Sequence, residues 1–269
     1  MNKIIDGKKI AAKLEIALKQ KTKKLKNKPK IVSVLVGDDP ASLLYTEIKE
    51  KKASQLGILF EAIKFKEEAT FEEVVSKIQE LNKDKTVTGV MVQLPLPRKF
   101  SGDREQYELL AEISPKKDVD GLTGKGKFQP AVVKAILSIL DQEKIELKGK
   151  VVTIIGASEL IGLPLSKELK KKKALVTVCD INTKNLREET LKSDIIIAAA
   201  GEAGLLYNKM VKEGVVVIDV GISKVDDKIV GDVDFESVEP LASKITPVPG
   251  GVGPVTVISL MENVVELAK

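Results

Sequence analysis

The sequence contains no histidine and no tryptophan, and its single cysteine is Cys179. One cysteine cannot form an intrachain disulfide, which agrees with the reducing conditions of the cytosol. Without histidine, the chain cannot build the Ser-His and Cys-His pairs of many hydrolases, and it lacks the usual ligand of zinc sites. Acid–base chemistry must therefore use lysine, tyrosine, aspartate or glutamate, and we expect no bound metal.

Arginine and aromatic residues are also scarce. The arginines are Arg98, Arg104 and Arg187, although lysine and arginine together number 44 and the net charge is +5. Proteins that bind nucleic acids usually concentrate arginine and aromatic side chains on one face. We therefore expect a solvated, lysine-rich surface and no nucleic-acid partner. A weaker alternative is that the lysines attract an anionic small substrate.

Long apolar runs are absent as well. No stretch is long enough to span a bilayer, and Met1 to Asp6 lacks the apolar segment of a signal peptide. These features predict a cytoplasmic protein with no membrane association. The apolar fraction of 43% is sufficient for the cores of one large or two medium domains.

Strand-like and helix-like segments alternate along most of the chain. Strands are expected at residues 31–36, 59–65, 89–93, 151–155, 175–179, 194–200 and 215–220. Helices are expected at residues 40–56 and 257–267, and two more are expected, one that begins at the capping box of residues 70–73 and one that ends at residue 173. This alternation predicts an α/β fold with parallel sheets and crossover helices. The boundary between two domains is expected near Asp120-Gly121. The C-terminal helix is expected to return to the first domain, because a terminal helix must bury its apolar face.

Three prolines and three glycines occur between Ile245 and Thr256. Proline fixes φ and removes a hydrogen-bond donor, whereas glycine permits close approaches to the backbone. We expect this segment to be neither ordinary helix nor central strand. A rigid loop with few side chains would suit a flat ligand, and the alternative is an elaborate turn.

A second glycine-containing segment begins at Val151. Its residues predict a strand, a turn with Gly156, Ala157, Ser158 and Leu160, and a helix that starts near Gly162. That order places backbone N–H groups and a helix dipole where a pyrophosphate could bind. The next strand ends before Asp180, where a dinucleotide fold places the carboxylate that binds ribose hydroxyls. An ordinary turn with a solvent-facing aspartate is the alternative.

Four side chains of the first half could carry chemistry. Tyr45 and Lys49 are spaced i, i+4 and share one helix face, so a partly desolvated Lys49 could transfer protons. An isolated pair of this kind is more often an exposed surface pair. Gln93 stands at the end of a strand, and Asp120 lies beside a turn glycine. Read singly, the segments around Gln93 and Asp120 are more typical of loops than of sites.

Taken in order, these segments resemble the methylenetetrahydrofolate dehydrogenase/methenyltetrahydrofolate cyclohydrolase family over nearly the whole chain. The segments that carry the resemblance are Val36-Gly-Asp-Asp-Pro-Ala-Ser42 with Tyr45 and Lys49, Val92-Gln-Leu-Pro-Leu-Pro97, Lys117-Asp-Val-Asp-Gly121, Gly156-x-Ser158 with Gly162-x-Pro164, Val217-Ile-Asp-Val-Gly-Ile222, Gly231-Asp-Val233, and Pro247-Val-Pro-Gly-Gly-Val-Gly-Pro254.

The resemblance implies a two-domain homodimer of one-carbon metabolism. A folate-binding catalytic domain would comprise residues 1–120 and the helix 254–269, a Rossmann-like NAD(P)-binding domain would comprise residues 121–253, and folate would bind in the interdomain cleft. The implied reactions are oxidation of 5,10-methylenetetrahydrofolate with NAD or NADP and hydrolysis of the methenyl product to 10-formyltetrahydrofolate, a step that supports purine biosynthesis. The lysine-rich surface could also help to capture a polyglutamylated folate.

The same resemblance implies roles for individual residues. Lys49 is the expected catalytic lysine, Gln93 orients it, Tyr45 packs against the folate rings, and Asp120 binds the pterin. The implied folate wall comprises Pro249, Gly250, Gly251 and Val252. The implied cofactor contacts come from Gly156, Ala157, Ser158, Leu160, Gly162, Asp180, Ala200, Gly221 and Ile222.

Two departures from the family pattern affect these expectations. The loop between Asp120 and Pro130 is shorter than the family resemblance implies, and Pro130-Ala-Val-Val133 replaces the family's usual Pro-Cys-Thr-Pro. Cys179-Asp180-Ile181 stands where many members have Cys-His-Ser, and Ala157 stands where many have arginine. A carboxylate repels a 2′-phosphate, and the arginine that could pair with it is missing, so NAD is expected over NADP.

Two other functions remain open at this point. One is an enzyme of this fold with a single activity, dehydrogenase or cyclohydrolase. The other is a non-catalytic protein that binds folate or a nucleotide, against which the joint presence of Tyr45, Lys49, Gln93 and Asp120 argues.

Overall fold

The computed structural model describes residues 3–100, 103–226 and 228–269. These residues form two units: an N-terminal unit of Lys13–Ala131 with Val257–Lys269, and a C-terminal unit of Val132–Thr256 with Met1–Ala12. The helices are α1 (Gly7–Lys23), α2 (Pro40–Leu56), α3 (Phe71–Lys83), α4 (Asp103–Ala111), α5 (Ala131–Gln142), α6 (Gly162–Lys171), α7 (Leu186–Lys192), α8 (Phe235–Val238) and α9 (Val252–Leu267), with short 3-10 turns η1 (Arg98–Phe100) and η2 (Asn208–Met210). The strands are β1 (Lys30–Val36), β2 (Leu59–Phe65), β3 (Gly89–Val92), β4 (Val151–Ile155), β5 (Leu175–Cys179), β6 (Ile195–Ala198), β7 (Val216–Asp219), β8 (Ser223–Val225), β9 (Lys228–Val230) and β10 (Lys244–Ile245).

These units differ from the expected division at three places. Residues 3–12 and 254–256 group with the C-terminal unit, and residues 121–131 group with the N-terminal unit. The end of α9 lies in the N-terminal unit, where the side chain of Asn263 donates a 2.9 Å hydrogen bond to the carbonyl of Val119.

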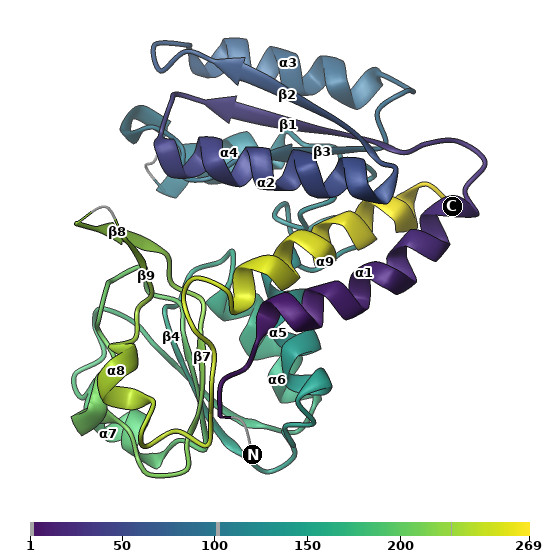
Figure 1. Cartoon of the computed structure of the whole chain (residues 1–269). Helices are drawn as coiled ribbons and strands as arrows, with labels where there is room; N and C mark the ends of the chain where they lie inside the picture. The colour runs from purple at the N-terminus through teal and green to yellow at the C-terminus, as the bar shows by residue number, and fades with distance from the viewer. Residues whose placement is uncertain (1–2, 101–102, 227) are drawn as a thin grey trace. The chain divides into compact units, whose positions relative to one another are not determined.

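The N-terminal unit contains a parallel three-stranded sheet in the order β2-β1-β3. The chain moves from β1 to one neighbour through α2 and then crosses to the other neighbour through α3. Because such crossovers are right-handed, the reversal of direction places the two helices on opposite faces of the sheet, as Figure 1 shows. The central strand β1 is accordingly an almost continuous buried apolar run.

Local signals determine where the helices of this unit begin and end. The carboxylate of Asp39 accepts a 2.8 Å hydrogen bond from the N–H of Ser42, Pro40 occupies the first turn of α2, and Gly57 ends the helix with φ = 75°. Thr70 and Glu73 form the predicted capping box of α3, since each side chain accepts a hydrogen bond from the other's backbone N–H.

The C-terminal unit contains a parallel five-stranded sheet in the order β10-β7-β6-β4-β5. From β4 the chain first adds β5 on one side and then returns to add β6 on the other. The carboxyl ends of β4 and β6 therefore flank a topological switch point, the place where open α/β sheets bind ligands. The short hairpin β8–β9 is antiparallel and separate from this sheet.

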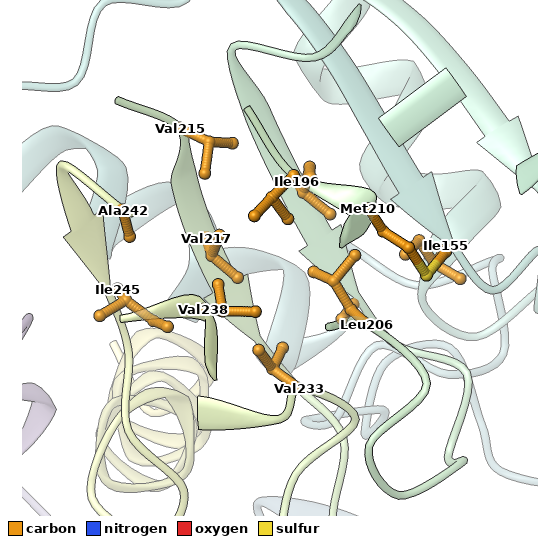
Figure 2. Packing of buried hydrophobic residues seen from close by; sticks show 12 residues of the cluster. Ile155, Ile196, Leu206, Met210, Val215, Val217, Val233, Val238, Ala242 and Ile245 are labelled. Carbon is orange, nitrogen blue, oxygen red and sulfur yellow. The ribbon is translucent and has the colours of Figure 1, made fainter. Parts of the chain in front are cut away.

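The core of this unit is built from branched aliphatic side chains. Figure 2 shows Ile155, Ile196 and Val217 from neighbouring strands, with Val238 from α8 and Ile245 from β10 in the same cluster. Each of these side chains is at most 3% exposed. Together they hold the parallel strands of the sheet against the chain that follows β7.

The proline- and glycine-rich segment is more regular than expected. Ile245 belongs to the edge strand β10, and α9 begins at Val252 rather than after Pro254. Pro254 fits because the N–H groups of a helix's first turn need no intrahelical acceptor. Only residues 246–251 form the loop. In the described ranges, no helix is both long and apolar enough to cross a membrane.

Candidate active site

One face of α2 points into the N-terminal unit. Its buried residues, which recur every three or four positions, are Ser42, Thr46, Lys49, Ala53 and Leu56. Tyr45 is half-buried on the same helix, and burial raises the pKa of its phenol. Lys49 is only 9% exposed, so it does not belong to an exposed surface pair.

The ammonium group of Lys49 has a specific partner. Its Nζ donates a 2.7 Å hydrogen bond to Oε1 of Gln93 and lies 3.9 Å from Sδ of Met91. Burial lowers the pKa of Lys49, and the negative charge of Asp120 acts in the opposite direction. A lowered pKa makes the neutral amine, which can accept a proton, more accessible than it would be on the surface.

The fold fixes which atom Gln93 presents to the lysine. The residue directly follows β3, and its N–H donates a 2.8 Å hydrogen bond to the carbonyl of Val34. Its side-chain Nε2 donates a 2.6 Å hydrogen bond to the carbonyl of Leu94, which precedes a cis peptide bond to Pro95. With its nitrogen held in this way, the amide must turn its oxygen toward Lys49.

Asp120 is electrostatically coupled to the same lysine. Burial raises the pKa of its carboxyl, the charge of Lys49 lowers it, and the charge of Asp118 raises it. The shifts of Asp120 and Lys49 both favour the neutral form. The structure thus brings Lys49, Gln93 and Asp120, three of the four predicted catalytic residues, into one environment, with Tyr45 on the same helix as Lys49.

Asp118 organises the loop that carries Asp120. Its Oδ1 accepts hydrogen bonds from the N–H of Gly121 at 2.8 Å and of Leu122 at 3.3 Å, and its Oδ2 accepts bonds from the N–H and hydroxyl of Thr123 at 3.0 and 2.7 Å. From the sequence, Asp118 was noted as a carboxylate in this segment, but no role was predicted for it. The signal was an aspartate followed by a turn glycine, a pattern in which the side chain bonds to nearby N–H groups.

The short loop after Asp120 is closed by backbone contacts. The N–H of Ala131 donates a 2.9 Å hydrogen bond to the carbonyl of Asp120. Gly121 has φ = 72°, and a Cβ there would lie 2.3 Å from the carbonyl oxygen of Gln129. The loop therefore needs glycine at this position both for conformation and for space.

The predicted phosphate-binding turn lies at the switch point of the C-terminal unit. Gly156 has φ = 112°, and a Cβ on it would lie 2.2 Å from the carbonyl oxygen of Ala199. A Cβ on Gly162, the first residue of α6, would lie 1.9 Å from the carbonyl oxygen of Gly156. Ile161 at the start of α6 makes no side-chain capping bond. This close strand–turn–helix packing at the switch point fits a dinucleotide.

The remaining turn residues take their expected places around this point. The hydroxyl of Ser158 accepts a 3.1 Å hydrogen bond from the N–H of Ile161, and both Ala157 and Leu160 lie in the same turn. Asp180 directly follows β5 and is exposed, and its Oδ1 accepts a 2.9 Å hydrogen bond from the N–H of Asn182. Asp180 therefore also stabilises its own turn.

Three further predicted cofactor residues follow the strands next to the switch point. Ala200 comes two residues after β6, and its N–H donates a 2.6 Å hydrogen bond to Oδ2 of Asp232. Gly221 and the exposed Ile222 come after β7. The buried carboxylates Asp219 and Asp232 lie beside these loops and were not assigned roles from the sequence.

The predicted folate-wall residues Pro249, Gly250, Gly251 and Val252 belong to the C-terminal unit. The peptide bond from Val248 to Pro249 is cis, and Gly250 has φ = 108°. A Cβ on Gly7 would lie 1.7 Å from the carbonyl oxygen of Gly251, so the loop packs directly on the start of α1.

Comparison with known proteins identifies the family to which both units belong. The family model of the tetrahydrofolate dehydrogenase/cyclohydrolase catalytic domain matches residues 5–120, and the model of the NAD(P)-binding domain of the same family matches residues 130–269. This chain belongs to the tetrahydrofolate dehydrogenase/cyclohydrolase family. The resemblance and the two-domain α/β fold expected from the sequence are confirmed.

The similarity to individual family members covers nearly the full length. The bifunctional protein FolD of Lactobacillus helveticus is 43% identical over 281 aligned positions that cover 100% of this chain and 98% of the relative. Since this chain has 269 residues, the relative carries residues that this chain lacks.

Two solved structures are also similar. The bifunctional FolD enzyme of Campylobacter jejuni has a TM-score of 0.91 and 42% identity, with 98% of each chain covered. The FolD of Trypanosoma brucei, solved with NADP and an inhibitor, has a TM-score of 0.91 and 30% identity, with 98% of this chain and 96% of that chain covered.

Proposed function

We propose that this protein oxidises 5,10-methylenetetrahydrofolate with NAD(P) and hydrolyses the 5,10-methenyl product to 10-formyltetrahydrofolate. The observation that carries the proposal is the buried hydrogen bond of 2.7 Å between Lys49 and Gln93, beside the charge of Asp120. It gives a chain without histidine one group suited to proton transfer. Full-length similarity to enzymes named as bifunctional FolD supports both activities.

Lys49 is the proposed catalytic residue of the hydrolysis. Attack of water on the methenyl carbon forms a C–O bond and releases a proton, and opening of the ring breaks one C–N bond. Neutral Lys49 accepts the proton from the attacking water, and the lysine ammonium then returns it to the departing nitrogen. The hydroxyl proton of the adduct is lost to solvent as the formyl C=O forms, so the hydrolysis releases one proton overall. Gln93 acts by holding Nζ in place, because its oxygen is already turned toward the lysine.

The proposed folate contacts in the N-terminal unit are Tyr45 and Asp120. Tyr45 offers an aromatic face to the folate rings, and Asp120 offers a carboxyl to the nitrogen-rich edge of the pterin. In the C-terminal unit, the proposed folate contacts are Pro249, Gly250, Gly251 and Val252, as the family resemblance implies. Aligning the substrate in this way leaves the reacting carbon positioned for oxidation and then for attack by water.

The NAD(P) cofactor is assigned to the switch point of the C-terminal unit. When bound, its nicotinamide ring accepts the hydride removed from the methylene carbon. Gly156, Ser158, Leu160 and Gly162 are the proposed phosphate-side contacts. On the nicotinamide side the proposed contacts are Ala200, Gly221 and Ile222.

We further propose that NAD is preferred over NADP. Asp180 follows β5, where its carboxylate can bind ribose hydroxyls and repels a 2′-phosphate, and Ala157 offers no positive charge in its place. Replacing Asp180→Ser should raise kcat/KM for NADP relative to NAD by about tenfold, the effect of losing one charge repulsion. Equal efficiency of the wild-type enzyme with both cofactors would refute the preference.

The first test is reduction of NAD and NADP in the presence of methylenetetrahydrofolate, with hydrolysis of methenyltetrahydrofolate followed separately. Activity in both assays supports the proposal. Hydrolysis without oxidation would identify a cyclohydrolase with a single activity, and ligand binding without turnover in either assay would identify a binding protein.

Three proposals concern the wider setting. The protein is proposed to be a cytoplasmic homodimer, for which light scattering should give twice the chain mass of 29.2 kDa. Its lysine-rich surface is proposed to favour polyglutamylated folates. That affinity should weaken with added salt, because screening acts on exposed charges, and a salt-independent affinity would refute it.

A further inference from the structure

Two buried aspartates stand beside the switch-point loops of the C-terminal unit. Asp219 is the last residue of β7, and Asp232 follows β9. Their exposed fractions are 3% and 0%. Carboxylates this deeply buried are stable only with hydrogen-bond donors around them, so their partners reveal what they hold.

Asp219 joins the end of β7 to two other segments. Its Oδ1 accepts hydrogen bonds from the N–H of Gly221 at 3.1 Å and of Asp232 at 3.0 Å, and its Oδ2 accepts one from the N–H of Val233 at 3.1 Å. The N–H of Asp219 itself donates a 2.7 Å bond to the hydroxyl of Thr246, the residue before the Pro247–Gly251 loop.

Asp232 extends this connection to β6. Its Oδ2 accepts hydrogen bonds from the N–H of Ala200 at 2.6 Å and of Gly201 at 3.0 Å. Its Oδ1 is buried and has no hydrogen-bond partner within the described part of the chain. The loop after β6 is therefore held by Oδ2 alone, and the other oxygen of the carboxylate has no partner.

Two glycines show how tightly the loops pack on these carboxyl groups. A Cβ on Gly221 would lie 1.9 Å from Oδ1 of Asp232, and a Cβ on Gly231 would lie 1.9 Å from Oδ2 of Asp219. Any larger residue would push a carboxylate out of place. The two aspartates and the two glycines therefore form one closely fitted unit, here called the aspartate clamp.

We propose that Asp219 and Asp232 are positioning residues of the cofactor site, and that the aspartate clamp fixes the loops after β6 and β7 in the arrangement that binds NAD(P). The clamp bonds directly to the backbone of Ala200 and Gly221, which are two of the proposed cofactor contacts. The inference rests on the proposed function of this unit. A preorganised loop binds more tightly because its ordering cost does not fall on the binding step.

The test uses Asp232→Ala and Asp232→Asn in the full-length protein, with Asp194→Ala as the matched control. Asp194 also bonds to the backbone, at 3.0 Å to the N–H of Val151, but it does so at the amino end of β4, away from the switch point. The readouts are the Kd for NAD and NADP by isothermal titration calorimetry, KM and kcat of the oxidation, and the rate of methenyltetrahydrofolate hydrolysis.

Asp232→Ala should raise the cofactor Kd and KM at least about tenfold, the effect expected from losing two backbone hydrogen bonds. Asp232→Asn retains an acceptor for the loop and should recover part of that loss. Hydrolysis should stay within about twofold for both variants and for Asp194→Ala, since that step needs no cofactor contact.

Two results would overturn the inference. In the first, both Asp232 variants bind the cofactor as the wild type does. In the second, oxidation and hydrolysis fall together in the Asp232 variants, which would mean a structural role only. A wild-type protein that binds neither cofactor would instead refute the proposed function itself, and the clamp would lose its role with it. If Asp232→Ala does not fold, the comparison of Asp232→Asn with the wild type decides.

Discussion

The Nζ of Lys49 lies 2.7 Å from the Oε1 of Gln93 across 44 residues of sequence, and both side chains are more than nine-tenths buried. A helix and a strand end, each with its own local reason to form, meet at this hydrogen bond. Because the hydrogen bond is shielded from water, the protonation state of Lys49 is sensitive to neighbouring charged and polar groups. Substitutions at either residue should therefore change the rate of hydrolysis.

Lys49→Met removes the proposed proton acceptor while keeping an unbranched side chain of similar length. Hydrolysis of methenyltetrahydrofolate should fall by a factor of about 10² to 10⁴, the usual contribution of a positioned acid–base group. The assay is the loss of methenyl absorbance with time. Lys51→Met, on the exposed side of the same helix, is the control and should leave the rate unchanged. An unaffected rate in Lys49→Met would show that the assignment is wrong.

Gln93→Glu places a carboxylate 2.7 Å from the lysine ammonium, if the geometry is kept. An opposite charge at this distance stabilises the protonated lysine and raises its pKa by about 1–3 units. The pH at which hydrolysis becomes fast should therefore move to more alkaline values. The measurement is kcat/KM against pH for the wild type, Gln93→Glu and the uncharged control Gln93→Leu. A profile that moves equally in both variants would rule out the electrostatic explanation.

Asp118→Ala should weaken folate binding by loosening the loop that carries Asp120. It removes the acceptor of four hydrogen bonds, three from backbone N–H groups and one from the hydroxyl of Thr123. We expect a loss of about 1–3 kcal/mol in the free energy of unfolding and a raised KM for folate. Asp84→Ala is the matched control, since Asp84 accepts bonds from the N–H and hydroxyl of Thr86 in an exposed turn. A folate KM equal to that of this control would argue against the role of Asp118.

Asp219 should make stability depend on pH. Burial and the charge of Asp232 raise its pKa from 3.8 to about 7, against the effect of three backbone hydrogen bonds. A carboxyl with a raised folded-state pKa stabilises the fold fully below the unfolded-state pKa near 4, and this contribution is lost as the pH rises toward 7. Between pH 4 and 7, the free energy of unfolding should therefore decrease less in Asp219→Asn than in the wild type, by an amount on the order of a few kcal/mol.

Denaturant titrations at several pH values measure this effect as the difference between Asp219→Asn and the wild type. The titratable neighbours are Asp232, which contacts Asp219, and Glu202, whose charge acts on Asp232. Glu202→Gln is the control for the indirect contribution and should change the slope much less. Parallel curves for the wild type and Asp219→Asn would mean that folding does not raise the pKa of Asp219.

The sequence predicted elements well where the signal was local. The bounds of α2, β2, β4 and β5 agree with the predicted segments, because caps, prolines and buried apolar runs act over a few residues. The start of α9 was predicted five residues too late, because proline usually ends a helix although the first turn of a helix tolerates it. No helix was predicted at α1, α4, α5, α7 or α8.

The candidate site divides in the same way between sequence and tertiary structure. The sequence alone determined the chemistry available: no histidine, one cysteine, and a small set of lysine, amide and carboxylate groups at strand and helix ends. Only the tertiary structure decided that Lys49 is buried against Gln93, that Asp118 holds the loop of Asp120, and that Asp219 and Asp232 join the loops after β6 and β7. Such roles arise from burial and from hydrogen bonds between residues distant in the chain, and no local sequence pattern encodes them.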